Sequence, residues 1–266
     1  MTTLSGNLQL FFRGAALSYR ALFRWFRPST YLASKIVMPL AQMIFFVFIG
    51  SFGGAAGPDF FIIGNAMQIA AVSGIYGVTM SIGGDRWDGT LAYLFGSPAN
   101  RLVLFFGRSL VHIVDGMLGV AIAFTWGVLL FGLRFAPDRL GLLSVAVLTA
   151  VFSTSGLGLL MGCVGLITRN VMFVNNTIYF LLLLLSGANV PLSDLPGWIQ
   201  RISTFLPLTH SIAAARTLIS GEAASEGVGI LLLKEVLVGL FYLIIGYALF
   251  RNFEIKAKKK GTLEVM

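Results

Sequence analysis

The sequence is poor in charged side chains, which make up only 11% of its 266 residues, whereas 57% are hydrophobic. A water-soluble domain carries about 25% charged residues. The shortage of charge therefore excludes an ordinary soluble domain of this length. Apolar runs long enough to cross a bilayer are present instead, and they predict an integral membrane protein.

Reactive side chains are equally scarce. Cys163 is the only cysteine, which excludes an intrachain disulfide and a cysteine-based zinc site. The two histidines, His112 and His210, are predicted on opposite sides of the membrane, so an intramembrane enzyme would lack a nucleophile–base pair or a metal ligand set. The phosphate-binding pattern GxxxxGK[ST] is also absent. We therefore expect neither a cofactor nor a metal on this chain.

Positive charge is in excess, with a formal net charge of +8. Nucleic-acid binding is one explanation, but Lys and Arg also collect in the cytoplasmic loops of membrane proteins. Arginines spread through the first 30 residues leave no apolar core for a cleavable signal peptide. We expect no nucleic-acid partner and a multi-pass protein of the inner or plasma membrane. Most basic residues fall on the side of the two termini, which predicts that both termini are cytoplasmic.

Apolar segments predict an all-α membrane protein with six transmembrane helices. The predicted spans cover about residues 32–52, 60–82, 102–131, 140–167, 171–190 and 230–250. We expect a single domain, in which residues 1–31 form a connecting helix, residues 32–250 the six-span bundle and residues 251–266 a basic cytoplasmic tail. In the fourth span, Gly158 and Gly162 form a GxxxG pattern that predicts close helix packing.

Residues 5–27 have the apolar rhythm of an amphipathic helix. Leu8, Phe12 and Tyr19 fall on one face and Arg13 on another. Such a helix suits the membrane interface, where membrane lipids are its partner. Packing against the rest of the protein is the alternative.

A polar stretch between the second and third spans is predicted to form a short cytoplasmic helix over residues 84–98. Acidic side chains at its start favour the positive end of the helix dipole. A short helix held below the membrane offers a surface for another protein, although an ordinary polar loop is the alternative. The candidate docking residues are Asp85, Arg86, Asp88, Gly89, Thr90 and Leu91.

Prolines divide residues 186–210 into short pieces, which predicts two short helices that re-enter the membrane from outside. Irregular backbone at membrane depth must be buried in protein or face water. We therefore expect this region to close the outer end of a pathway. The candidate residues of this outer gate are Pro191, Leu195, Pro196, Trp198, Pro207 and His210.

The last two regions resemble the membrane subunits of type-2 ABC exporters, near the drug-resistance and nodulation-factor exporter permeases. The resemblance covers essentially the whole chain. Its patterns are Ser-Gly, Pro-Leu-Ser-x-Leu-Pro-x-Trp and Leu-Pro-Leu-Thr-His within 186–210, and acidic-Arg-x-x-Gly-Thr-Leu at 85–91. The family often has Glu at the position of Asp85 and an acidic residue at that of Ala92, so the detailed docking contacts differ.

The resemblance implies a division of labour. Residues 84–98 would be a coupling helix that seats in a groove of a separate ATP-binding subunit. Two copies of that subunit, which hold ATP and Mg, would work with two permeases, of the same or a sister chain. This chain would not be an enzyme by itself. The complex would export an amphiphilic drug, lipid or glycolipid-like substrate.

The resemblance also implies a route lined by the first, second and fifth spans. Aromatic and amide side chains in these spans are candidates to line it, although lipid-facing or core packing and interhelical hydrogen bonding are alternatives. The candidate pathway residues are Phe45, Phe46, Asn65, Gln68, Asn175 and Tyr179.

Arg108, His112 and Asp115 form a polar cluster on one face of the third span, at spacing i, i+4, i+7. Ionisable residues within a span are costly and suggest a function. A structural network near the cytoplasmic interface and a polar contact on the pathway are both open. The alternative function is an ion- or proton-coupled carrier that uses Asp115, although the internal repeats usual in carriers are not evident.

Overall fold

The computed structural model describes residues 4–25, 27–54, 56–87, 89–90, 93, 96–97, 100–166, 168, 170–221 and 227–260. Its regular elements are all helical, and no described residue forms a strand, so the all-α prediction is confirmed. In chain order the α-helices are α1 (Leu4–Trp25), α2 (Pro28–Gly53), α3 (Pro58–Ala71), α4 (Val78–Trp87), α6 (Arg101–Phe131), α7 (Leu140–Gly165), α8 (Val171–Leu185), α9 (Gly197–Ser203), α10 (Thr209–Ser220) and α11 (Val228–Lys260). A π-helix, η1 (Val72–Gly77), joins α3 to α4, and η2 (Pro137–Arg139) and η3 (Leu192–Asp194) are short 3-10 turns.

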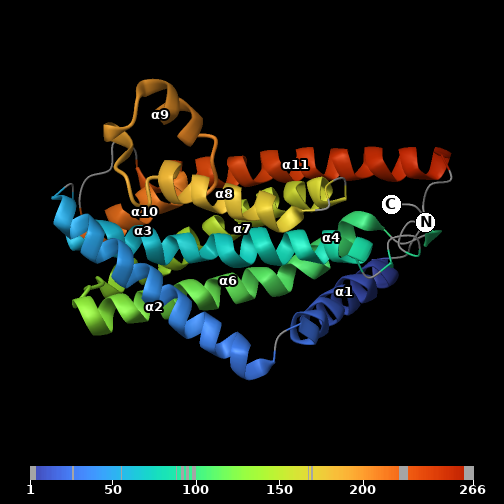
Figure 1. Cartoon of the computed structure of the whole chain (residues 1–266), viewed down its shortest axis with the longest axis horizontal. Coiled ribbons are helices and arrows are strands. Elements are labelled where there is room, and N and C mark those ends of the chain that lie inside the picture. The colour runs from blue at the N-terminus through green and yellow to red at the C-terminus, as the bar shows by residue number, and fades with distance from the viewer. Residues whose placement is uncertain are drawn as a thin grey trace.

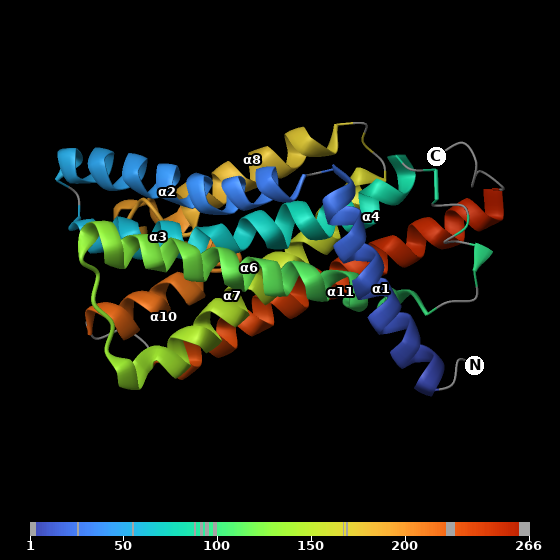
Figure 2. The same ribbon diagram turned by 90° about the horizontal axis from the view of Figure 1, so that it is seen from below.

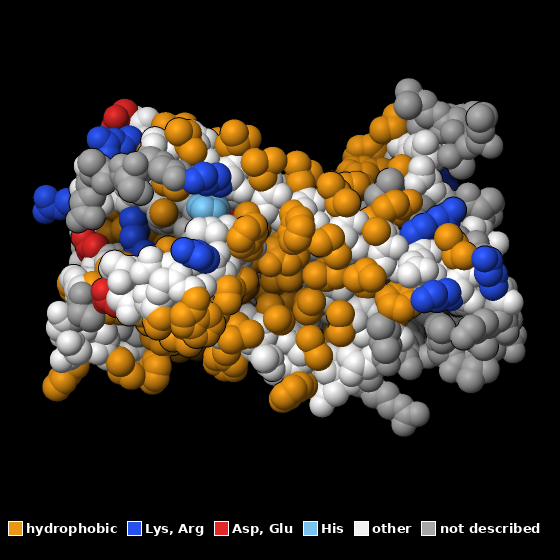
Figure 3. All heavy atoms as spheres, turned by 90° about the horizontal axis from the view of Figure 1, so that it is seen from above, with side chains coloured by type: hydrophobic (Ala, Val, Ile, Leu, Met, Phe, Trp, Pro, Cys, Tyr) orange, Lys and Arg blue, Asp and Glu red, His pale blue; other side chains and the backbone are white. Residues whose placement is uncertain are grey.

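The long helices run along one axis of an elongated bundle (Figure 1). Helix α1 and the last turns of α11 lie at one end, which we name the terminal end. The start of α3 lies with α9 and α10 at the opposite end, the distal end. On the face seen in Figure 3, hydrophobic side chains gather in the middle, while Lys and Arg lie toward both ends. An apolar belt between charged ends is typical of a protein that crosses a bilayer.

Among the described residues, five helical stretches are long and apolar enough to cross a membrane. They are Pro28–Gly53, Pro58–Gly84, Val103–Phe131, Pro137–Gly165 and Val228–Lys256. The remaining predicted span is shorter: α8 has 15 residues, and the prediction that it continues to Val190 is wrong. Gly187 takes a φ of 80°, beyond the reach of a continuing helix, and the chain bends from Ser186 onward.

Helix ends follow local chemistry. Proline stands at the start of α2 and of α3, where its fixed φ suits the first turn and its missing N–H needs no partner. Gly54, with a φ of 65°, terminates α2. At the start of α8, the Asn170 side chain accepts a hydrogen bond from the Phe173 N–H at 3.2 Å.

Helices α3, η1 and α4 form a continuous column at the centre of the bundle. The side chains from Phe61 to Ala71 are all buried. A Cβ on Gly158 of α7 would come within 2.1 Å of the Gly74 carbonyl oxygen in η1, so the close packing predicted for Gly158 is confirmed. The π-helix itself has no counterpart in the sequence prediction.

Other helices surround this column. Helix α11 packs along α7, and α6 packs on α3. In Figure 2, α2 and α8 lie along one edge of the bundle, and α7 and α11 lie toward the other. Helix α11 continues as far as Lys260, so the predicted tail begins as helix.

Helix α1 packs on α6 through small residues. The Gly14 position faces Leu104, and Ser18 is buried near His112. The opposite side of α1 leaves Leu8, Phe12 and Tyr19 exposed. Helix α1 therefore both packs on the protein and presents an apolar face outward.

Candidate functional site

Helix α2 has little cover within one chain. Of its described residues, only Pro39, Met43 and Val47 are buried. Large apolar side chains on α2 and α8 are exposed, including Ile44, Phe45, Phe48, Phe52, Met172, Phe173, Phe180 and Leu184. We name this surface the α2–α8 face. The predicted pathway residue Phe45 lies on it, whereas Phe46 is half-buried and contacts the Phe45 ring edge-on.

A network of neutral polar side chains lies beneath the α2–α8 face. Gln42 Nε2 donates to Asn65 Oδ1 at 3.0 Å, and the Tyr179 hydroxyl donates to Gln42 Oε1 at 2.7 Å. Asn65 Nδ2 also donates to Asn189 Oδ1 at 2.7 Å. These bonds join α2, α3, α8 and the segment after α8. The predicted pathway residues Asn65 and Tyr179 are therefore buried and occupied with interhelical hydrogen bonds.

The other predicted amides are also buried. Gln68 Nε2 lies 3.5 Å from the Tyr179 carbonyl oxygen, while Gln68 Oε1 and both amide atoms of Asn175 have no hydrogen-bond partner among the described residues. The neighbouring Asn176 is exposed and accepts a 2.6 Å hydrogen bond from the Tyr76 hydroxyl. The pair Tyr76–Asn176 therefore places polar atoms at the surface between η1 and α8. The sequence prediction did not single out Gln42, Asn189 or Tyr76.

Asp115 lies in an ion pair that the sequence prediction did not contain. Lys35 Nζ lies 2.6 Å from Asp115 Oδ2 and 2.9 Å from Ser73 Oγ. Ser73 and Tyr31 both donate their hydroxyl hydrogens to the Asp115 carboxylate. The Asp115 carboxylate thus joins the start of α2 and the π-helix η1 to α6, and the Lys35 ammonium lies beside it.

The other members of the predicted polar cluster contact different elements. His112 is buried, with Nε2 3.4 Å from Ser18 Oγ of α1, and a Cβ on Gly77 would lie 2.3 Å from His112 Nδ1. Arg108 donates from Nη1 to the Ser81 carbonyl oxygen at 2.6 Å. The α6 face that bears this cluster therefore packs against η1, α4 and α1.

Within residues 186–210, where two short re-entrant helices are predicted, the structure has the 3-10 turn η3 and the short helix α9, and α10 begins only at Thr209 and continues to Ser220. Their re-entry into the membrane stays a prediction. Pro196 precedes α9, which carries Trp198 and Ile202 exposed, with Trp198 at 66%, and Phe205 is exposed just after the helix. Gln200 Nε2 ties α9 back to the Leu195 carbonyl oxygen at 2.8 Å. Figure 1 shows α9 standing away from the bundle.

The remaining gate candidates lie closer to the bundle. Pro207 is buried, as is His210, whose Nε2 lies 3.0 Å from the Thr204 carbonyl oxygen. Pro191 and Leu195, half-buried, flank the 3-10 turn η3.

Glu235 is a functional candidate that the sequence prediction missed. Its side chain is fully buried in α11. The carboxylate accepts hydrogen bonds from the N–H groups of Leu208, His210 and Ser211, and from the Ser153 hydroxyl. A Glu inside an apolar span was the available signal, because such a residue is costly without partners.

The predicted docking segment is described only in part. Asp85 and Arg86 belong to the last turn of α4, so the prediction that Asp85 opens a separate helix is wrong. Gly89, at a φ of 68°, and Thr90 follow as an exposed turn, which is where the helical column stops. Asp88 and Leu91 lie outside the described residues.

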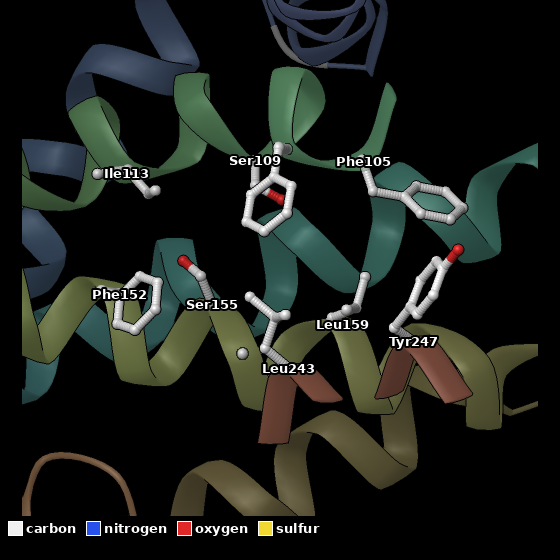
Figure 4. A pocket seen from close by; sticks show the side chains of 10 residues that line it. Phe105, Ser109, Ile113, Phe152, Ser155, Leu159, Leu243 and Tyr247 are labelled. Atoms are coloured by element: carbon white, nitrogen blue, oxygen red, sulfur yellow. The ribbon is translucent and has the colours of Figure 1, made fainter. Parts of the chain in front are cut away.

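A small cavity lies between α6, α7 and α11 (Figure 4). Its lining is almost wholly apolar and includes Phe105, Ile113, Leu159 and Leu243, and none of its lining residues belongs to α2 or α8. The cavity is therefore separate from the candidate pathway. Among the described residues, no group of three or more His, Cys, Asp or Glu could hold a metal ion.

Comparison with known proteins agrees with this architecture. Residues 14–219 match the family described as "ABC-2 type transporter". The chain is 24% identical over 242 residues to the "Daunorubicin resistance ABC transporter permease protein DrrB1" of Streptomyces coeruleorubidus, across 88% of this chain and 84% of the relative. It is 26% identical over 221 residues to the "Probable doxorubicin resistance ABC transporter permease protein DrrC" of Mycobacterium tuberculosis, across 80% of this chain and 79% of the relative. A 26% identical match to the "ABC transporter G family member 20" of Dictyostelium discoideum covers 73% of this chain but 26% of that longer protein.

Proposed function

The chain belongs to the ABC-2 type transporter family, and from that premise we propose that it is the permease subunit of an ATP-driven exporter. A separate ATP-binding subunit, in two copies, supplies the ATP and Mg chemistry. A second permease, the same or a sister chain, completes the membrane part. No nucleic acid takes part.

The observation that carries the proposal is the α2–α8 face. Its phenylalanines are more than half exposed in the described part of the chain, and a hydrogen-bonded polar network lies behind them. A second permease laid against this face encloses a route between the two α2 helices. The route then has aromatic walls from Phe45 and Phe48, with polar atoms of Tyr76 and Asn176 at their edge.

This lining favours an amphiphilic substrate. Aromatic rings bind flat apolar molecules, and hydroxyl and amide groups hydrogen-bond to polar substituents. An amphiphilic drug, a lipid or a glycolipid-like molecule satisfies both requirements. Two relatives bear the names of daunorubicin and doxorubicin resistance, so daunorubicin is the first substrate to test.

We assign the terminal end of the bundle to the cytoplasm and the distal end to the outside of the cell membrane. Charged side chains of α11 at the terminal end support this orientation, since Arg251, Lys256 and Lys259 are exposed there. Helix α8 then serves as the sixth crossing. Its 15 residues span about 22 Å, and the segment after Leu185 completes the distance to the outer surface.

Coupling to the ATP-binding subunit uses residues 84–98. Helices α3, η1 and α4 form one column from the distal end to Trp87, next to Gly89 and Thr90. When the ATP-binding subunit displaces the turn after α4, the whole column moves with it, including Asn65 and Tyr76 behind the α2–α8 face. Asp85, Arg86, Asp88, Gly89, Thr90 and Leu91 are the proposed docking residues.

The carrier alternative has less support. A proton- or ion-coupled carrier needs a carboxylate that exchanges its cation. Lys35 is a tethered cation that already occupies Asp115, and Ser73 and Tyr31 supply further hydrogen bonds.

Purification of the tagged chain from its host in mild detergent tests the proposal. We expect a stoichiometric ATP-binding-cassette subunit in the sample and ATP-dependent uptake of daunorubicin by inside-out vesicles. Gly89→Val should abolish the association, because a β-branched residue does not adopt a φ of 68°. Gly53→Val, at an open position on α2, is the matched control and should keep it. A chain that purifies without any ATPase would contradict the proposal.

A further inference from the structure

Helix α10 begins inside the protein without a cap of its own. Leu208 precedes it with a φ of 77°, in the left-handed region, and makes no side-chain capping bond. Leu208 is fully buried, so water cannot satisfy the N–H groups that a helix start leaves without partners. Those donors need an acceptor from elsewhere in the fold.

Glu235 is that acceptor. It lies about two turns into α11 and is 0% exposed. Its Oε1 accepts from the Leu208 N–H at 2.7 Å, and its Oε2 accepts from the N–H groups of His210 and Ser211 at 3.1 Å each. The left-handed turn at Leu208 aims its N–H at the same carboxylate.

A fourth bond extends the contact to α7, since the Ser153 hydroxyl donates to Glu235 Oε1. One carboxylate therefore joins the consecutive helices α10 and α11 to α7, which is distant in sequence. Breaking this cluster would leave buried backbone donors without an acceptor, which is costly inside a protein.

Arg216 holds the same helix on its other side. Its Nη2 donates to the carbonyl oxygens of Phe60 at 3.0 Å and Ala188 at 3.1 Å, and its guanidinium carbon lies 3.5 Å from the centre of the Phe60 ring. Helix α10 is thus held to other parts of the protein at both of its ends. Glu235 fixes its start to α11 and α7, and Arg216 fixes its last turns to α3 and the segment after α8.

We propose that Glu235 is a positioning residue for export, which makes the outer re-entrant segment move together with α11 and α7. The role of Glu235 in transport rests on the proposed exporter function. The attachment of α10 to α11 and α7 through Glu235, which we call the tie, does not depend on that function. Without the tie, ATP hydrolysis in the partner would still move the helices, but the gate at the distal end would no longer follow them.

Thiol labelling tests the tie independently of transport. Cys163→Ala removes the only cysteine, and Thr209→Cys places a reporter at the start of α10, where the side chain is 3% exposed. The full-length chain is reconstituted in nanodiscs, which expose both membrane faces, and is treated with a charged maleimide. We expect slow labelling with Glu235 present and labelling about ten-fold faster in Glu235→Gln, because the amide cannot accept all the backbone bonds. An unchanged rate overturns the proposal.

Glu254→Gln is the matched control. Glu254 is a second buried carboxylate on α11, at the terminal end, where it pairs with Arg251 at 2.9 Å. This variant should leave the labelling of Thr209→Cys unchanged, and faster labelling would show that any carboxylate lost from α11 loosens the fold. If Glu235→Gln does not assemble, the labelling rate of Thr209→Cys is measured in Ser153→Ala instead. It removes one donor and keeps the carboxylate, so a smaller acceleration supports the tie and an unchanged rate contradicts it.

The functional arm uses the complete complex with its ATP-binding subunit in vesicles. Glu235→Gln should retain ATP hydrolysis while daunorubicin export falls about ten-fold, a split that general unfolding would not produce. Equal loss of hydrolysis and export would contradict the positioning role. A wild-type complex that hydrolyses ATP but exports nothing, or no complex at all, would count against the exporter function and leave the labelling result intact.

Discussion

Lys35 Nζ lies 2.6 Å from Asp115 Oδ2, so the start of α2 is bound to the middle of α6 by an ion pair inside the protein. The two side chains are 13% and 10% exposed. Among its described residues α2 buries only Pro39, Met43 and Val47, so this pair adds a polar link to a helix that has few buried apolar contacts.

Removing one partner of this pair should be more harmful than exchanging both. Lys35→Ala leaves the Asp115 carboxylate buried without its cation, and we expect a loss of about 3–5 kcal/mol in the free energy of unfolding. The double variant Lys35→Met/Asp115→Leu should recover most of that loss. Titration with a denaturing detergent, followed by tryptophan fluorescence, measures both. Equal losses in the single and double variants would contradict the ion-pair account.

The second prediction concerns Gly64, where α3 meets the segment after α8. A Cβ at this position would lie 2.1 Å from the Ala188 carbonyl oxygen, which also receives the Arg216 bond. Gly64→Ala should therefore displace this segment and lower the melting temperature of the purified protein. Gly141→Ala is the control, because α7 leaves open space at Gly141 and alanine favours a helix. Similar melting temperatures for the two variants would show that the contact is easily relaxed.

The third prediction concerns the hydrogen bond of 2.7 Å between Tyr179 and Gln42. A double-mutant cycle with Tyr179→Phe and Gln42→Ala should yield a coupling of about 0.5–1.5 kcal/mol in unfolding free energy, the usual net value of one hydrogen bond. The companion cycle of Tyr179→Phe with Thr125→Ala should yield none, since Thr125 bonds only within α6 to Ala121. Additive effects in the first cycle would remove this bond from the network.

The fourth prediction separates the α2–α8 face from other lipid-facing surfaces. Phe45 on α2 is 56% exposed and Phe241 on α11 is 51% exposed. Under the proposed exporter function, with daunorubicin as the test substrate, Phe45→Ala should reduce export by the complex several-fold at unchanged basal ATP hydrolysis, because it removes an aromatic wall of the proposed route. Phe241→Ala should export normally. Equal export by both variants would place the route elsewhere.

The sequence predicted most of the helices because each is a long apolar run, and nothing but helix satisfies the backbone over such a length in lipid. It also located the short helices near Trp198 and His210, where prolines divide the chain. The end of α8 was placed too late, since an apolar composition does not reveal that Gly187 adopts a positive φ.

Partners distant in sequence were harder to predict. Lys35 lies within the first predicted span, and nothing in the neighbouring sequence indicates that it reaches Asp115, 80 residues away. Glu235 was overlooked because its acceptor role depends on how α10 is packed against α11, which no local pattern encodes. Gly74 and Gly77 of the π-helix Val72–Gly77 likewise pack tightly against Thr154 and His112, which the local sequence does not reveal.

The atoms that form hydrogen bonds with Glu235 and Arg216 at the two ends of α10 are largely main-chain atoms, which nearly every amino acid supplies. The side chains at 60, 188, 208, 210 and 211 can therefore be exchanged without deleting an N–H donor or a carbonyl acceptor, except by proline at the last three positions, which has no N–H. The position of α10 therefore depends mainly on main-chain contacts and little on the side chains that surround the helix. Substitutions of the side chains around α10 can therefore change its surroundings while these main-chain contacts with Glu235 and Arg216 remain.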